Sequence, residues 1–226
     1  MKTTNLEFES RESEVNKYME VLCLLDKGDC KIVCKDILGN EESKSIDVEL
    51  SKILKANTFI LLYNLIESTV TNSLNAIFLA IENENVSYDA LSKEIKYLWV
   101  RDRAKTIKDI SRAADVIEKI SEELVEKHFI KLTRNCVNIS GNIDAQEIRK
   151  IAKQVGWDET KDGRELENIK KKRNQLAHGE YTFSAIGKDV SLKELIEIKD
   201  KTIAYLRDTL QKVALYINDK KYLQIK

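Results

Sequence analysis

The absence of proline is the feature that most constrains how this chain folds. Its 226 residues contain no proline and only seven glycines. Proline and glycine are the residues that most often interrupt helices, so a chain with so few of them can form long, continuous helices. Hydrophobic residues make up 42% of the sequence, which is enough to build a sizeable core. The composition therefore predicts a mainly α-helical protein.

The hydrophobic pattern agrees with this prediction along most of the chain. The strongest signal runs from residue 47 to 84, where a broad apolar face indicates burial on more than one side. Further helices are predicted over residues 9–26, from a cap at Ser87, over 110–127, from a cap at Asp144, over 162–177, and from a cap at Ser191 to 218.

One stretch has a different pattern. Residues 30–38 are apolar and β-branched and lie between two glycines, which predicts a short strand or hairpin arm. We assign residues 1–45 to an N-terminal helix and short extended arm packed on the core. Residues 46–226 are assigned to the main helical domain.

Overall charge gives no general affinity for nucleic acid. The 38 basic residues balance the 38 acidic ones, so any nucleic-acid site must come from local clustering. No stretch reaches about 18 uninterrupted apolar residues, and the N-terminus is not followed by the apolar core of a signal peptide. We expect a cytoplasmic protein without membrane contact.

Cysteine usage gives no strong sign of a metal site. The four cysteines lack the closely spaced pairs of zinc knuckles, and we expect free thiols in a reducing compartment. The alternative is a zinc site built from Cys23, Cys30, Cys34 and a distant fourth ligand. We expect neither a metal nor another cofactor.

The most informative segment carries one of only two histidines and a run of cations. It reads Lys170-Lys171-Lys172-Arg173-Asn174-Gln175-Leu176-Ala177-His178-Gly179-Glu180-Tyr181. Apolar residues before it recur at helical spacing, and Gly179 stands where a helix commonly stops in a left-handed residue. His178 is thus expected at the end of a helix, where the dipole favours the imidazolium.

This segment brings together groups suited to phosphoryl chemistry. Asn174 lies four residues before His178, so its amide could hydrogen-bond a ring nitrogen. Histidine moves protons near neutral pH, and arginine binds phosphate through two parallel hydrogen bonds. The alternative interpretation is structural: the histidine only caps the helix, and the lysines form a solvated surface.

Arg173 and His178, separated by four residues with Asn174 directly after the arginine, resemble the signature of the HEPN superfamily. The string from Arg173 to Phe183 is similar to one prokaryotic branch, generally found beside defence and toxin–antitoxin genes. The resemblance implies an all-α, up-and-down bundle of long helices that forms a homodimer or larger assembly. In many members it also implies metal-independent RNase activity, whereas some members have lost the activity and act as binding modules.

The resemblance also suggests supporting residues. Glu67, on the early long helix, is a candidate to hold Arg173, the alternative being a solvated glutamate. Lys170, Lys171 and Lys172 are candidates for RNA binding. Tyr181 occupies a place near that of a tyrosine which antitoxin enzymes modify in some HEPN toxins, although the spacing differs.

A second candidate RNA surface comes from the residues themselves. Basic residues beside Tyr97 and Trp99 could line an RNA groove, because aromatic rings stack on bases. The alternative is an amphipathic helix whose tryptophan belongs to the core.

We expect an endoribonuclease in which Arg173, His178 and Asn174 act on an RNA substrate in a cleft at a dimer interface. Its expected setting is phage defence or a toxin–antitoxin system, with an antitoxin or another defence protein as partner. One alternative is a non-catalytic module that binds RNA, a nucleotide or a partner protein. Another is a structural component whose arginine and histidine stabilise a dimer.

Overall fold

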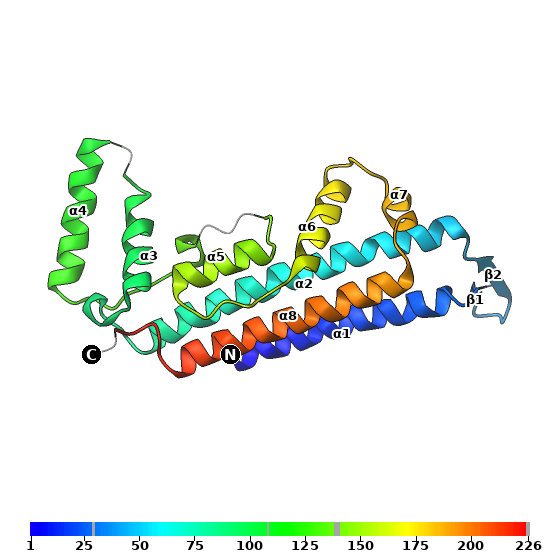
Figure 1. Cartoon of the computed structure of the whole chain (residues 1–226), viewed down its shortest axis with the longest axis horizontal. Helices are drawn as coiled ribbons and strands as arrows, with labels where there is room; N and C mark the ends of the chain where they lie inside the picture. Colours follow the sequence, from blue (N-terminus) through cyan, green and yellow to red (C-terminus); the bar gives the residue numbers. More distant parts are fainter. Residues whose placement is uncertain (29, 108, 138–140, 225–226) are drawn as a thin grey trace. The chain divides into compact units, whose positions relative to one another are not determined.

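The structure is a computed structural model that describes residues 1–28, 30–107, 109–137 and 141–224 (Figure 1). These residues contain eight α-helices and one two-stranded sheet, which confirms the all-α prediction. Two 3-10 turns, η1 (Tyr88–Ala90) and η2 (Arg134–Cys136), complete the described elements. The α-helices are α1 (Lys2–Leu25), α2 (Val48–Asn83), α3 (Lys93–Ala104), α4 (Ile110–Val125), α5 (Ala145–Val155), α6 (Arg164–Ala177), α7 (Phe183–Lys188) and α8 (Leu192–Asn218).

The chain divides into two compact units. The first, here called the α3–α5 unit, comprises residues 1–5, 67–162 and 205–226. The second, here called the α6 unit, comprises residues 6–66 and 163–204. The predicted boundary between residues 45 and 46 stays a prediction.

In the α6 unit, α1 packs against the first half of α2. The hydroxyl of Tyr18 donates a hydrogen bond to the backbone oxygen of Leu54 over 2.6 Å. The buried side chains of α1 recur at spacings of seven, four and three, which defines one apolar face: Phe8, Val15, Met19 and Leu22. Apolar side chains of α6, α7 and the first half of α8 are also buried, among them Leu166, Ile169, Ile186 and Leu195.

Helix α7 approaches the beginning of α2 so closely that only glycine fits at the contact. A Cβ atom placed on Gly187 would lie 1.8 Å from the backbone oxygen of Lys52. That atom is fixed in the backbone of α2 and has no rotamer that moves it away. The sequence pattern predicted no helix between residue 177 and the cap at Ser191, yet α7 forms there: Thr182 caps it by accepting a hydrogen bond from the backbone N–H of Ala185.

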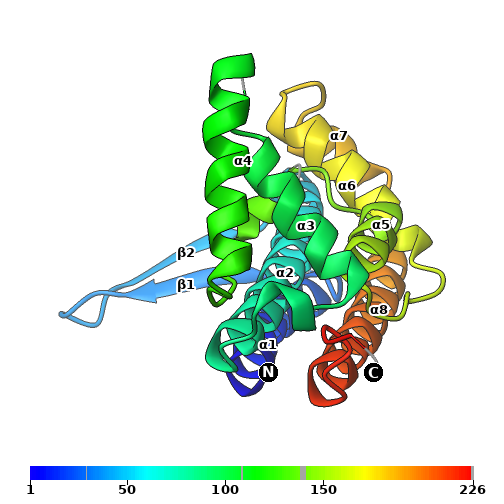
Figure 2. The same ribbon diagram turned by 90° about the vertical axis from the view of Figure 1, so that its left-hand side faces the viewer.

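The predicted hairpin arm is present between α1 and α2. Strands β1 (Lys31–Lys35) and β2 (Glu41–Ser45) pair antiparallel, with Lys31 opposite Ser45 and Lys35 opposite Glu41. Figure 2 shows the hairpin extending away from the helices of the α6 unit. Both strands are exposed along their whole length, and so are the two apolar residues at the tip, Ile37 and Leu38.

In the α3–α5 unit, buried tyrosines tie the end of α8 to other elements. The hydroxyl of Tyr216 donates to the backbone oxygen of Val155, at the end of α5, over 2.8 Å. The predicted cap of α5 is confirmed, because the Asp144 side chain accepts from the backbone N–H of Glu147. Gly156 ends this helix in the left-handed region, at φ 105°.

One predicted helix start in this unit was wrong. Ser87 precedes only the single turn η1, and α3 begins five residues later, after Ser92. The cause is tertiary: Leu91 forms an isolated bridge with Leu223, and the backbone N–H of Ser92 donates to Tyr222. These contacts hold Leu91 and Ser92 extended between η1 and α3.

Candidate active site

The end of α6 is built as the sequence predicts. Gly179 lies in the left-handed region at φ 68°. Its N–H donates to the backbone oxygen of Leu176 over 3.2 Å, and the N–H of Glu180 donates to Gln175 over 3.0 Å. This pair of bonds is the Schellman motif, which satisfies the last carbonyls of a helix. The predicted glycine stop is thereby confirmed.

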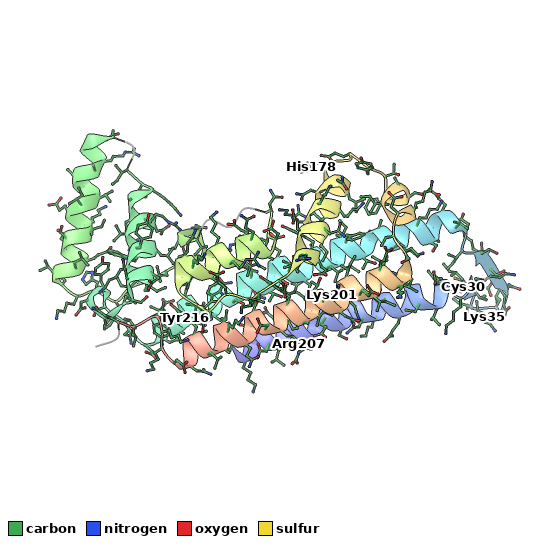
Figure 3. The ribbon with its side chains drawn as sticks, in the orientation of Figure 1. Cys30, Lys35, His178, Lys201, Arg207 and Tyr216 are labelled. Atoms are coloured by element: carbon green, nitrogen blue, oxygen red, sulfur yellow. The ribbon has the colours of Figure 1, made fainter. Side chains whose placement is uncertain are left out.

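His178 is the first residue after the helical span and lies at its tip (Figure 3). Its backbone N–H still bonds to the oxygen of Asn174 over 2.9 Å, whereas its side chain is exposed. Within the described residues, the imidazole makes no hydrogen bond or ion pair. The ring is therefore open to an incoming ligand, at the end of a helix where negative dipole charge accumulates.

Arg173 is held differently, because it lies on the inward face of α6. Its guanidinium carbon is 3.6 Å from the centroid of the Tyr63 ring. Nη1 also donates to the side-chain oxygen of Asn174 over 2.8 Å. Tyr63 is 1% exposed, so this cation–π contact forms in a largely dehydrated place, where such contacts are strongest. The guanidinium is thus oriented from two sides before any substrate arrives.

The contact with Asn174 adds to the role predicted for that residue. We expected its amide to orient the imidazole, and the structure places its oxygen on Arg173. A neutral amide can position a guanidinium without cancelling its charge, which a carboxylate would do. The predicted contact between Asn174 and the imidazole stays a prediction.

The lysines before Arg173 point in different directions around α6. Lys171 is exposed, whereas Lys170 and Lys172 are half-buried. Residues 171, 174 and 178 are spaced by three and four, so Lys171, Asn174 and His178 share one line along the helix. This line brings an exposed ammonium group to the same side of α6 as the imidazole.

The two remaining candidate residues are Tyr181 and Glu67. Tyr181 is 52% exposed in the turn after α6, where its N–H donates to the backbone oxygen of Gln175. Glu67 is half-buried on α2, four residues after Tyr63 and on the same helical face. Its predicted support of Arg173 stays a prediction, because the two residues belong to different compact units.

Tyr63 is the functional candidate that the sequence did not reveal. It stands within the apolar run of α2, where an aromatic residue is most simply explained as core. The available signal was on the other helix: Arg173 shares spacings of three and four with Leu166, Ile169 and Leu176, all buried. An arginine on an apolar face needs a partner, and an aromatic ring is one of the few that suits it.

Trp99 does not form the RNA surface considered for it. It is 1% exposed, so the alternative, a core tryptophan, is confirmed. Its ring packs against Tyr88, with the centroids 5.3 Å apart. Tyr97, in contrast, is 65% exposed.

The described residues contain neither a metal-binding cluster nor a membrane-spanning helix. Among the described residues, no group of three or more histidine, cysteine or acidic side chains is arranged to hold a metal ion, and this includes the cysteines considered for zinc. In the same residues, no helix is long and apolar enough to cross a membrane.

The fold and the arginine–histidine helix end define a helical protein of the HEPN class. A model of the MAE_28990-like HEPN family matches residues 2–222, nearly the whole chain, so the protein belongs to this family. Searches among curated proteins and among solved structures returned no significant match.

Proposed function

We propose that the protein is a metal-independent endoribonuclease of the HEPN type. The observation that supports this most directly is the oriented guanidinium of Arg173, five residues before the exposed imidazole of His178. One group is held in place by an aromatic ring and an amide, and the other is accessible and able to exchange protons. RNA cleavage needs both.

The chemistry uses the RNA's own nucleophile. The ribose 2′-oxygen loses its proton and attacks the neighbouring phosphorus, and the bond to the 5′-oxygen of the next nucleotide breaks. The products are a 2′,3′-cyclic phosphate and a free 5′-hydroxyl, and the proton taken from the 2′-hydroxyl is balanced by one given to the leaving oxygen. His178 serves as the base or the acid, and Arg173 neutralises charge that grows on the non-bridging oxygens.

A second copy of the chain would supply the missing proton-transfer group. One exposed histidine cannot comfortably remove one proton and deliver another at opposite sides of the same phosphorus. Two α6 ends brought together in a homodimer would place two imidazoles and two guanidinium groups in one cleft. We accordingly place the reaction at a dimer interface.

We assign the lysines before Arg173 to binding of the RNA substrate, and Tyr181 to contact with a partner protein. Lys171, on the same side of α6 as His178, would bind a phosphate beside the scissile one, with Lys170 and Lys172 flanking it. The resemblance of the segment from Arg173 to Phe183 to a HEPN branch found beside defence genes suggests a setting in phage defence or a toxin–antitoxin system. There, an antitoxin would act on the exposed tip that carries His178 and Tyr181.

The alternative function is a non-catalytic HEPN module that binds RNA, a nucleotide or a partner protein. The exposure of His178 favours it, because within the described residues the imidazole makes no hydrogen bond that fixes its orientation. A histidine without a fixed orientation is a weaker general base. The same guanidinium would then hold phosphate without cleaving the strand.

Cleavage of labelled RNA in the presence of EDTA separates these functions. We expect the wild-type protein to generate fragments ending in a cyclic phosphate, identified by mass spectrometry. His178→Ala and Arg173→Ala should each lower the rate by about 100-fold or more, within the usual range for a proton-transfer group or a charge-stabilising donor.

The chain provides a matched control for the histidine. His128 is also exposed, and its Nε2 lies 2.7 Å from the carboxylate of Glu126. His128→Ala should cleave RNA as the wild type does. Equal activity in wild type, His178→Ala and Arg173→Ala would contradict the assignment, and RNA binding without any cyclic-phosphate product would favour the binding module.

A further inference from the structure

A groove of about 780 Å³ lies within the α3–α5 unit, apart from the residues of the arginine–histidine helix. One wall is a face of α3, where lining residues recur at spacings of three and four: Lys93, Lys96, Tyr97 and Val100. Helix α5 contributes two more lining residues, Lys153 and Gln154. Tyr88 of η1 and Gln224 also line the groove.

The groove is predominantly positive. Three lysines line it, against the single carboxylate of Glu94, and one of the three, Lys153, also pairs with Glu159 over 3.3 Å. Lys96 is held in place, because its ammonium group donates to the backbone oxygen of Asp89 over 3.0 Å and to the side-chain oxygen of Gln224 over 3.1 Å. Lys93 is exposed. The charge of this groove thus suits an anion, although the chain as a whole is neutral.

The groove also presents an exposed aromatic ring, Tyr97, which contacts a neighbouring guanidinium group. Tyr97 is 65% exposed, and the guanidinium of Arg101 lies 5.9 Å from its ring centroid. The same guanidinium donates to the side-chain oxygen of Gln154 over 3.4 Å. Arg101 therefore supports both an exposed ring and an amide on the groove wall.

We propose that this groove binds a nucleotide, either free or as one unit of a single-stranded RNA. The base would stack on Tyr97, and the phosphate would lie among the lysines. The side-chain oxygens of Gln154 and Gln224 accept bonds from Arg101 and Lys96, and each amide offers its NH2 donors to the acceptors on the edge of a base. An acidic peptide would use the lysines but would leave the exposed ring without a matching group.

The proposal does not depend on RNA cleavage, and its test avoids it. The full chain carrying His178→Ala is titrated with two probes, a fluorescein-labelled single-stranded RNA decamer and a fluorescent analogue of adenosine triphosphate. In this background, we expect Tyr97→Ala to weaken binding of the RNA, the mononucleotide or both by about 5-fold or more, the range for loss of one base-stacking partner. Tyr97→Phe keeps the ring and should bind as tightly as the background protein.

The chain supplies controls for both kinds of contact. Phe129 is 61% exposed in the same unit and does not line the groove, so Phe129→Ala should leave binding unchanged. Lys93→Ala should reduce the slope of log affinity against log salt for the RNA by about 0.7, the value for one phosphate contact on a single strand. Lys119→Ala, which removes an exposed lysine of α4, should leave that slope unchanged.

The two probes identify the natural source of the ligand. Loss of RNA affinity alone in Tyr97→Ala assigns the groove to a strand, and loss of mononucleotide affinity assigns it to a free nucleotide. Unchanged affinity of Tyr97→Ala for both probes would overturn the proposal. So would equally effective displacement of both probes by a polyglutamate peptide. Because His178→Ala is already present, neither result depends on whether the wild-type protein cleaves RNA.

Discussion

The guanidinium carbon of Arg173 lies only 3.6 Å from the centroid of the Tyr63 ring. Tyr63 comes from α2 and is 1% exposed, whereas Arg173 comes from the last turns of α6. A buried ring from one helix therefore fixes the direction of a cation on another. The position of the Arg173 guanidinium thus depends on a residue of the buried core.

This contact predicts that Tyr63 positions Arg173 through its aromatic face. Tyr63→Leu keeps an apolar side chain but removes the ring, and it should lower the rate of RNA cleavage by about 10- to 100-fold, as expected for misplacement of a reacting group. Tyr63→Phe keeps the ring and should restore the rate to within about 3-fold of wild type. The measurement is single-turnover cleavage, with thermal unfolding recorded for both variants.

The two variants also distinguish the contribution of the Tyr63 ring from that of its hydroxyl. If Tyr63→Phe loses as much activity as Tyr63→Leu, the hydroxyl rather than the ring is responsible. If Tyr63→Leu cleaves as the wild type does, the ring has no positioning role.

A second prediction concerns which neighbour Asn174 serves. If it orients Arg173, as the 2.8 Å bond indicates, Asn174→Ala should lower the cleavage rate by about 10-fold at every pH. The inflection of the pH–rate profile that reports the imidazole should then stay where it is in the wild type. A shifted inflection would instead mean that Asn174 acts on His178.

The close approach of α7 to α2 predicts a strong effect at Gly187. Gly187→Ala would bring a Cβ within 1.8 Å of the Lys52 backbone oxygen, so the backbone must move. We expect the free energy of unfolding to fall by about 3 kcal/mol, the upper part of the range for overpacking. Denaturation in urea measures the change.

Gly179 provides the comparison for this prediction. It has a positive φ but no atom within 4 Å of a Cβ built on it, so Gly179→Ala introduces backbone strain alone. That strain amounts to about 1–2 kcal/mol. A loss of stability in Gly179→Ala equal to or larger than that in Gly187→Ala would show that the contact between α7 and α2 is not tight.

A fourth prediction concerns alkaline pH. Burial raises the pKa of Tyr18 from 10.0 to about 12, and burial likewise raises that of Tyr205 to about 12. The folded state therefore keeps protons that the unfolded chain releases above pH 10. Stability from these groups is complete below pH 10 and is lost as the pH rises towards 12.

Urea denaturation between about pH 8 and about pH 12 tests this sign. The free energy of unfolding should be lower at the alkaline end, and Tyr18→Phe should make the decrease shallower because one titrating group is gone. A stability that is constant or increasing above pH 10 would contradict the assignment. Phenolate absorbance of the folded protein gives an independent measure of the tyrosine titration.

Much of this architecture followed from local patterns. The broad apolar face of residues 47–84, the cap at Asp144 and the stop at Gly179 are signals within one segment, and each appears in the structure. The second strand of the hairpin, Glu41–Ser45, is entirely polar and gave no signal. Its position is set by pairing with β1, in register from Lys35 opposite Glu41.

The elements that were missed depend on contacts distant in sequence. Leu91 and Ser92 are held extended by residues 222 and 223, so no local pattern could delay the start of α3. For the candidate site, the motif identified Arg173 and His178, and the structure added Tyr63, more than 100 residues earlier in the chain. An aromatic residue within a hydrophobic run is indistinguishable in sequence from an ordinary core residue, so Tyr63 could not be paired with Arg173 beforehand.

The Schellman end of α6 has a consequence for how such a protein changes over time. Backbone bonds place residue 178 at the end of the helix, and its side chain is exposed. If the proposed RNA cleavage is correct, replacing that one side chain should lower the cleavage rate by about 100-fold or more while leaving the scaffold in place. A single substitution at residue 178 would then convert the proposed nuclease into a binding protein with the same fold.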